Sequence, residues 1–306
     1  MDLLKNYMRN MNIAGAVGDI LSANETVWVQ RVLEDNPRLF DAFLNPENND
    51  LSKVMWHGEF PGKLLSGAAQ TYLLHNDPET KKVGDRMVIL FQKAQGEDGY
   101  LGPWKEAVRF NKDVLQQSLG KWDTWGQYHC IYGLYRWYQV TGNRNALDVA
   151  IRALDGIYAY FIAGGQTFVS QNWAECNLAI GHAFALLYEE TGKTSYLETA
   201  EYIVNEEWNL EYPDFYTKKS LSCGWMKAAL AGKAFYESGQ PRWEGLYALS
   251  SLAELYRATG DETYNAALES LWWGILRTDR HNTGSFGTGE GASGDLYGNG
   301  SETCNT

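Results

Sequence analysis

One short motif, Tyr-X-X-Thr-Gly, closes three stretches of helical periodicity in this chain. It occurs at residues 138–142, 188–192 and 256–260, and a second apolar stretch with the same periodicity follows each occurrence. Glycine directly after a helix adopts the left-handed conformation that other residues resist, so it ends the helix. Each motif therefore predicts the corner of an antiparallel helical hairpin.

The remaining pattern extends these hairpins along the whole chain. A further corner without glycine is predicted where Asn76 and Asp77 precede Pro78, because proline suits the first turn of a helix. The predicted helices cover residues 13–34, 62–75, 79–94, 125–141, 144–161, 172–191, 194–207, 224–237, 243–259 and 262–277, with room for two more in 1–12 and 104–119. We predict a single all-α domain over residues 1–306, closed as an (α/α)₆ toroid, that ends in a glycine-rich loop at 281–306.

The composition restricts the partners of such a domain. The chain has 38 acidic and 26 basic residues, for a formal net charge of −12. Nucleic acid and anionic membranes need clustered Lys and Arg, so neither is an expected partner. The chain also has 12 Trp, 19 Tyr and 11 Phe. Most of these rings are expected in the core, but exposed ones can stack on sugar rings, which favours a carbohydrate substrate.

The cysteines and the N-terminus bear on the compartment. The four cysteines form no Cys-X-X-Cys motif, and we expect Cys130, Cys176 and Cys223 to be buried free thiols. The N-terminal residues lack the apolar core of a signal peptide, and no apolar run is long enough to span a membrane. These features predict a cytoplasmic protein; the sequence leaves the oligomeric state open.

Polar and aromatic residues at helix starts are the candidates for substrate binding, because the inner helices of a toroid direct these ends into a central cleft. The candidates are Trp56, His57, Glu59, Lys63, Asp123, Trp125, His129, Asn172, His182 and Trp243. Structural roles compete with this interpretation. Asp123 is also suited to be a helix N-cap, and a lone helical histidine such as His129 is more often a core residue.

The C-terminal segment has the most distinctive chemistry. Glu302 stands two residues before Cys304, and a carboxylate and a thiolate at this spacing can share a soft divalent metal such as zinc. Glu290 lies upstream and can serve as a proton donor. Two ligands on a loop bind zinc weakly, so we expect the 306-residue chain to hold little of it.

Several of these segments together resemble glycoside hydrolase family 127, the β-L-arabinofuranosidase family. They are residues 95–101, the helix that carries His129, the Gly-His-Ala-Phe segment at 181–184, and residues 283–304. The resemblance implies an (α/α)₆ catalytic barrel followed by β-sandwich domains, and a retaining mechanism with a zinc-bound cysteine nucleophile. Carried over by position, Glu290 is the acid/base, and Glu302 and Cys304 are zinc ligands.

The sequence departs from the family at the nucleophile. The family's nucleophile belongs to a Cys-Cys pair downstream of Glu-Thr-Cys, and the 306 residues contain neither that pair nor the β-sandwich region. The prediction is a catalytic barrel cut short, with negligible activity by itself. Two alternatives stay open: a metal-independent toroid enzyme, namely an unsaturated-uronide hydrolase or a sugar epimerase, and an inactive sugar-binding barrel.

Overall fold

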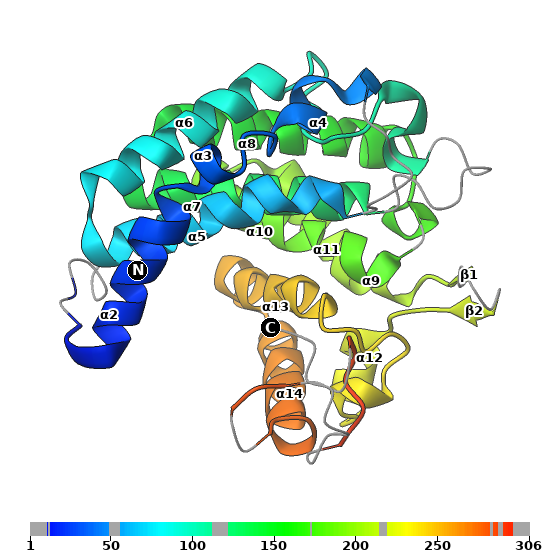
Figure 1. Ribbon diagram of the computed structural model, residues 1–306. Coiled ribbons are helices and arrows are strands. Elements are labelled where there is room, and N and C mark those ends of the chain that lie inside the picture. The colour runs from blue at the N-terminus through cyan, green and yellow to red at the C-terminus, as the bar shows by residue number, and fades with distance from the viewer. Residues whose placement is uncertain are drawn as a thin grey trace. The chain divides into compact units, whose positions relative to one another are not determined.

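A computed structural model describes most of the chain, namely residues 11, 13–48, 56–111, 122–171, 173–213, 219–281, 284–286 and 290–295. These residues are predominantly helical, and the strands among them are the two-residue β1 (Tyr212–Pro213) and β2 (Ser220–Leu221), which pair antiparallel (Figure 1). The chain forms two compact units, Met1–Tyr160 and Phe161–Thr306. The all-α class is thereby confirmed, with helical hairpins of the kind that an (α/α)₆ toroid requires.

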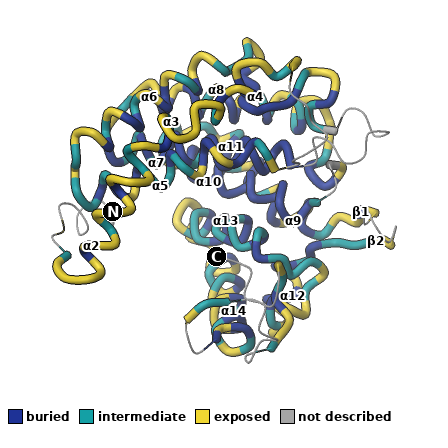
Figure 2. Tube along the Cα trace, viewed as in Figure 1, coloured by how far each residue is buried: buried dark blue, intermediate teal, exposed yellow. Residues whose placement is uncertain are grey.

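The first unit contains two long helical hairpins, α5 with α6 and α7 with α8. Its elements are α2 (Gly15–Ala23), η1 (Asn24–Val29), α3 (Val32–Asp35), α4 (Asp41–Leu44), η2 (Pro46–Asn48), η3 (His57–Glu59), α5 (Phe60–His75), α6 (Pro78–Ala94), η4 (Glu106–Asn111), α7 (Asp123–Thr141) and α8 (Arg144–Tyr158). Most side chains of α7 are buried, whereas α2 is almost wholly exposed (Figure 2). Helix α7 is therefore the centre of this unit.

Glycines bring α5 and α7 into backbone contact. A Cβ atom on Gly62 would lie 2.3 Å from the carbonyl group of His129, and one on Gly133 would lie 2.4 Å from the carbonyl oxygen of Gly62. Side chains larger than hydrogen do not fit at such distances. The contact between the two helices consequently fixes the main chain at His129.

The second unit contains the hairpins α10 with α11 and α13 with α14. Its elements are η6 (Phe168–Gln171), α9 (Ala174–Asn177), α10 (Ile180–Thr191), α11 (Thr194–Asn205), η7 (Glu207–Asn209), β1, β2, α12 (Trp225–Leu230), η8 (Phe235–Glu237), α13 (Gly245–Thr259) and α14 (Glu262–Thr278), and η5 (Ala159–Ala163) links it to the first unit. A chain of buried rings, Trp208, Trp225, Phe235 and Trp243, forms part of its core, with successive centroids 5.1 to 6.4 Å apart. Among the helices described, none has the length and apolar character needed to cross a bilayer.

The predicted corners are confirmed at their glycines. The φ angle is 74° at Gly142, 67° at Gly192 and 71° at Gly260, so each glycine ends its helix in the left-handed conformation. Asn76 ends α5 in the same way, with φ at 54°. Asparagine tolerates this conformation better than most residues with a side chain, which explains a corner without glycine.

The threonine of the motif has a separate function in each corner. The hydroxyl of Thr141 donates to the carbonyl oxygen of Trp137 at 2.6 Å and accepts the N–H of Asn143 at 3.2 Å. Thr191 and Thr259 make the same pair of hydrogen bonds. One hydroxyl therefore joins the last turn of one helix to the first residue after the glycine, which explains why Thr and Gly recur together.

Three predicted helices were wrong in their continuity. The predicted helix 172–191 is divided into α9 and α10. At the division, the N–H groups of Ala179, Gly181 and His182 donate to the carbonyl oxygen three residues earlier, not four as in an α-helix. The predicted helix 224–237 ends at Leu230, and Gly232 follows in the left-handed conformation. The predicted helix 13–34 is interrupted by the π-helical η1.

Candidate functional site

The first unit gathers several predicted residues around the carboxylate of Glu59. The indole N–H of Trp125 donates to Glu59, and the ammonium group of Lys63 pairs with it at 3.0 Å. The ring of His129 lies edge-on to Trp125, with centroids 4.3 Å apart. Burial and, to a lesser degree, the charge of Lys63 hold the pKa of His129 well below its usual value, so this imidazole is neutral.

Exposure within this cluster is uneven. Trp56 is 41% exposed, and its ring lies 6.0 Å from that of Trp122. Lys63 is also exposed, whereas Glu59, Trp125 and His129 are buried. Burial lowers the pKa of His57, which is partly buried. Trp56 is therefore an exposed aromatic ring within this predicted group.

Asp123 joins the start of α7 to the preceding loop. Its carboxylate is 1% exposed and accepts hydrogen bonds from the hydroxyl of Tyr100 at 2.9 Å, the N–H of Phe110 at 2.9 Å and the amide of Gln127 at 3.2 Å. The alternative prediction that Asp123 is the N-cap was wrong, because Trp122 occupies that position. All three bonds are internal, so the carboxylate fixes the loop.

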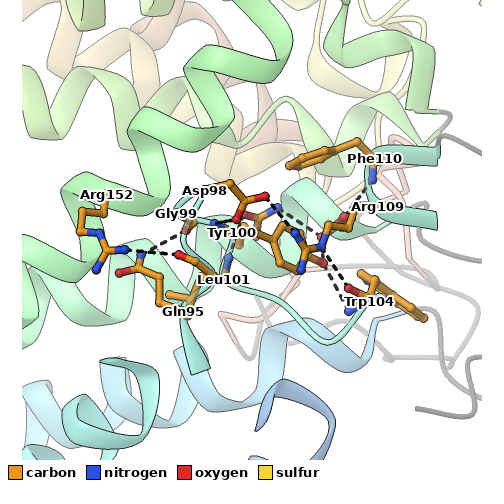
Figure 3. A network of polar contacts seen from close by, with 12 residues as sticks. Gln95, Asp98, Gly99, Tyr100, Leu101, Trp104, Arg109, Phe110 and Arg152 are labelled. Carbon is orange, nitrogen blue, oxygen red and sulfur yellow. Dashed lines mark hydrogen bonds and ion pairs between the residues drawn. The ribbon is translucent and has the colours of Figure 1, made fainter. Parts of the chain in front are cut away.

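The loop itself is stabilised by a second charged group. The guanidinium of Arg109 lies 3.8 Å from the ring centre of Tyr100 and pairs with Asp98 at 2.9 Å (Figure 3). Gly99 packs against α8, where a Cβ atom would lie 2.2 Å from the carbonyl oxygen of Arg152. The segment 95–101, on which part of the family resemblance depends, therefore has a structural function in connecting α6, α7 and α8.

The buried Asp123 should make stability depend on pH. Burial raises the pKa of Asp123 from 3.8 to about 6, despite the hydrogen bonds that favour its ionised form. The folded state therefore binds this proton more tightly than the unfolded chain, and the resulting stabilisation is present below about pH 4 and lost as the pH rises to about 6. We expect the stability advantage of wild type over Asp123→Asn to fall across this interval, as measured by urea unfolding. A difference that stays constant from pH 4 to 7 would contradict this assignment.

The second unit gathers three carboxylates around one guanidinium. Arg242 contacts Glu244 through two nitrogens, at 3.1 and 2.8 Å, and Glu290 at 2.9 Å. Its Nε lies 3.6 Å from a carboxylate oxygen of Glu175, and its guanidinium carbon lies 5.4 Å from the ring centre of Trp173. We call Glu175, Arg242, Glu244 and Glu290 the Arg242 cluster. It contains the predicted acid/base residue.

The members of the Arg242 cluster differ in burial. The side chain of Glu175 is 4% exposed, and that of Glu290 is 67% exposed. Burial raises the pKa of Glu175 to about 6, in spite of the opposing charge of Arg242. The hydroxyl of Tyr212 donates to Glu175 at 3.4 Å. The cluster thus combines one buried carboxyl group that holds a proton in mildly acidic solution with one carboxylate open to solvent.

The main chain fixes Glu290 from both sides. The N–H of Trp243 donates to the carbonyl oxygen of Glu290 at 3.1 Å, and the N–H of Ala292 donates to that of Pro241 at 2.7 Å. The buried Asp279 accepts hydrogen bonds from the N–H groups of Ser293 and Gly294, at 2.8 and 3.0 Å. These hydrogen bonds hold residues 290–294 against the rest of the second unit independently of the Glu290 side chain.

The other predicted site residues have various placements. His182 is buried in α10, and Trp243 is fully buried between Phe235 and Phe286. Asn172, Glu302 and Cys304 lie outside the described residues. Their roles, and those of the other predicted binding residues, stay predictions.

The structure bears on the cysteines and on metal binding. Cys130, Cys176 and Cys223 are buried free thiols, as predicted. Burial raises the pKa of Cys130 and of Cys223 well above the usual thiol value, so both are protonated. Within the described ranges, no group of three or more His, Cys, Asp or Glu side chains is placed to hold a metal ion.

The prediction of site residues from sequence missed Arg242. It directly precedes the predicted Trp243, and the following Glu244 provides a signal, since Arg and Glu two residues apart in a loop can form a bidentate pair. The backbone of Trp173, whose ring lies near Arg242, gives a second signal, and this one is visible only in the structure. Trp173 has a φ of 47°, and a bulky residue in the left-handed conformation often marks a functional segment.

Comparison with known proteins identifies the family. The family model of the β-L-arabinofuranosidase GH127 catalytic domain matches residues 21–306. The non-reducing end β-L-arabinofuranosidase of Bifidobacterium longum subsp. longum is 29% identical over an alignment of 254 residues, and the match covers 74% of this chain and 36% of that protein.

Solved structures agree on the fold. A GH127 β-arabinofuranosidase matches with a TM-score of 0.65 at 20% identity, over 90% of this chain and 45% of that one. A GH127 β-L-arabinofuranosidase from Geobacillus stearothermophilus T6 matches with a TM-score of 0.63 at 21% identity, over 88% of this chain and 45% of that one. The chain thus spans less than half the length of these relatives. By the match to the family model, this chain belongs to the β-L-arabinofuranosidase GH127 catalytic-domain family.

Proposed function

We propose that this chain is the catalytic domain of a retaining, exo-acting glycoside hydrolase that removes a terminal sugar such as β-L-arabinofuranose. The observation that carries the proposal is the family match over residues 21–306. The name of the Bifidobacterium relative, a non-reducing end β-L-arabinofuranosidase, supports both the exo mode of action and the sugar.

Glu290 is the proposed acid/base. A retaining hydrolase needs a carboxylic acid that protonates the leaving oxygen while the glycosidic bond breaks, and that later takes a proton from the attacking water. The side chain of Glu290 is exposed and can therefore reach a substrate. Hydrogen bonds along residues 290–294 hold its backbone in one place. The family resemblance assigns the nucleophile of the first step to a Cys-Cys pair, and these 306 residues contain no such pair.

The charge of the Arg242 cluster favours a neutral substrate. Arg242 already shares its single positive charge among Glu175, Glu244 and Glu290. A sugar carboxylate placed beside this group would meet an excess of negative charge. This argues against the alternative of an unsaturated-uronide hydrolase, whose substrate carries such a carboxylate, if that substrate were bound at the Arg242 cluster.

A substrate screen tests the proposal. The active form of the protein is assayed with aryl glycosides of neutral and acidic sugars, together with measurement of sugar binding. We expect release of the aryl group from β-L-arabinofuranosides with retention at the anomeric carbon. Turnover of unsaturated uronides alone would overturn the proposal, and sugar binding without any turnover would favour an inactive sugar-binding barrel.

Zinc remains a proposed cofactor, with Glu302 and Cys304 as ligands. A carboxylate and a thiolate are donors that zinc accepts, and bound zinc keeps a thiol ligand deprotonated. We expect zinc to bind wild type more tightly than Cys304→Ser, although weakly in the 306-residue chain, because these two ligands are fewer than the usual three or four. Competition with a metal-binding dye measures this without any assay of activity. Equal affinities would exclude Cys304, and stoichiometric tight zinc in wild type would show that further ligands complete the site.

A further inference from the structure

We propose that Arg242 is a positioning residue for Glu290, held in place by Glu244 and Glu175. The inference rests on the proposed acid/base function of Glu290 and extends it to a second residue. Arg242 and Glu290 are 48 residues apart in the sequence, yet their side chains meet at 2.9 Å. The contact sets where an otherwise exposed carboxylate lies.

The contact is supported by the main chain on both sides. Arg242 and Gly291 form an isolated antiparallel bridge. Glu290 directly precedes Gly291, so the backbones of Arg242 and Glu290 lie close together. The N–H of Trp243 donates to the carbonyl oxygen of Glu290 at 3.1 Å. Because both backbones are fixed, a side-chain contact between Arg242 and Glu290 restricts the carboxylate to a small region.

Arg242 is itself more firmly held than Glu290. Glu244 binds it through two nitrogens, and this bidentate geometry fixes the plane of a guanidinium group. Glu175 approaches from the buried side at 3.6 Å, and Trp173 lies near the guanidinium group. Glu290 contacts one nitrogen, which Glu244 shares. Arg242 can therefore guide Glu290 while Glu290 remains able to leave it.

Charge compensation makes this arrangement compatible with proton donation. An isolated arginine beside an acid favours the ionised form of that acid, which would oppose its use as a proton donor. The bidentate carboxylate of Glu244 compensates much of the Arg242 charge. Glu244 thus lets Arg242 hold the position of Glu290 while much of the Arg242 charge is compensated.

Kinetics with substrates of different leaving groups test the proposal in the active, full-length enzyme. If Arg242 acts through Glu290, Arg242→Gln should lower kcat/KM, which reports the first step, by about 10-fold or more for poor leaving groups, because misplacement of a catalytic group is costly. For good leaving groups, which need little protonation, we expect a loss below about threefold. Arg242→Lys keeps the positive charge but loses the planar guanidinium group. Its kcat/KM for poor leaving groups should lie between those of wild type and Arg242→Gln.

The double variant separates positioning from general damage. In Glu290→Gln with Arg242→Gln, kcat/KM for poor leaving groups should be no lower than in Glu290→Gln alone, because no proton donor remains to be positioned. The matched control is Arg257→Gln, which removes an arginine that binds two carboxylates, Glu189 and Glu254, in the same unit. We expect this control to leave the leaving-group dependence unchanged.

A measurement independent of activity uses amide hydrogen exchange in the 306-residue chain. Main-chain hydrogen bonds and Asp279 hold residues 290–294, so Arg242→Gln should leave exchange of the Trp243 and Ala292 amides close to that of wild type and of Arg257→Gln. The proposal is overturned if kcat/KM falls equally for all leaving groups while Glu290→Gln discriminates among them. It is also overturned if Arg242→Gln accelerates exchange of both amides, because Arg242 then maintains the backbone rather than the position of the carboxylate. If Glu290→Gln itself does not discriminate, the assigned acid/base is wrong, and that failure is distinct from the failure of Arg242.

Discussion

Replacing Glu290 by glutamine is expected to lower turnover of poor leaving groups by at least ~10²-fold, the usual scale of general acid catalysis. Glutamine has nearly the same shape and keeps a hydrogen-bonding oxygen, but it carries no acidic proton. The contact between Arg242 and Glu290 is 2.9 Å long, and a neutral oxygen can still accept that hydrogen bond. The substitution therefore removes the proton with little disturbance of the cluster. Steady-state kinetics with aryl glycosides of graded leaving-group acidity measures the effect.

The same series contains its own control. Substrates with very acidic phenols should lose least in the first step, since their oxygens leave without protonation. Glu254→Gln removes a carboxylate that pairs with Arg257 at 2.8 Å elsewhere in the unit, and should leave turnover unaffected. A loss in kcat/KM that is uniform over all leaving groups would assign Glu290 to substrate binding or to structure, because kcat/KM reports the first step alone.

The substitution Gly62→Ala is expected to destabilise the first unit by about 3 kcal/mol, although it adds a single methyl group. That methyl group would lie 2.3 Å from main-chain atoms of His129, which cannot rotate away as a side chain can. The two helices would have to separate, and the contact between Gly133 and Gly62 would be lost with them. Urea unfolding followed by circular dichroism measures the change.

Gly67 provides the matched comparison on the same helix. A Cβ atom at Gly67 would have no neighbour within 4 Å, so Gly67→Ala meets no obstacle. Alanine favours a helix over glycine by about 1 kcal/mol, and we expect Gly67→Ala to be neutral or stabilising. Opposite signs at Gly62 and Gly67 would identify the helix contact as the cause. Equal effects at both positions would contradict it.

The fold was largely predictable because the corners are encoded locally. A left-handed glycine and a hydroxyl that bridges the turn depend on a few consecutive residues, and the sequence contains those residues at three places. The interruptions were not predictable in this way. Helical periodicity continues through residues 178–179, whereas the structure divides there, and the left-handed Trp173 just before α9 contradicts the ordinary preference of a bulky residue.

The candidate site was predictable only in part for a related reason. Glu290 was predicted because the segment around it resembles the family, and Glu59, Lys63 and Trp125 because they are close in sequence to helix starts. Arg242 was missed, since its contact with Glu290 joins segments 48 residues apart. The internal role of Asp123 depends on Tyr100, which lies 23 residues upstream. Sequence spacing does not reveal such pairings.

The threonine corners also bear on how the chain folds. Each hydroxyl bridges groups that are at most six residues apart, so its bonds form without closing a long loop. Contacts of this kind shorten the average sequence separation and favour fast folding. The hairpin of α7 and α8 can therefore assemble while the chain is still being synthesised, before α13 and α14 exist. The distant pairing of Arg242 with Glu290 must come later, because Glu290 follows α13 and α14 in the chain, so the proposed catalytic carboxylate reaches its position only after these helices exist.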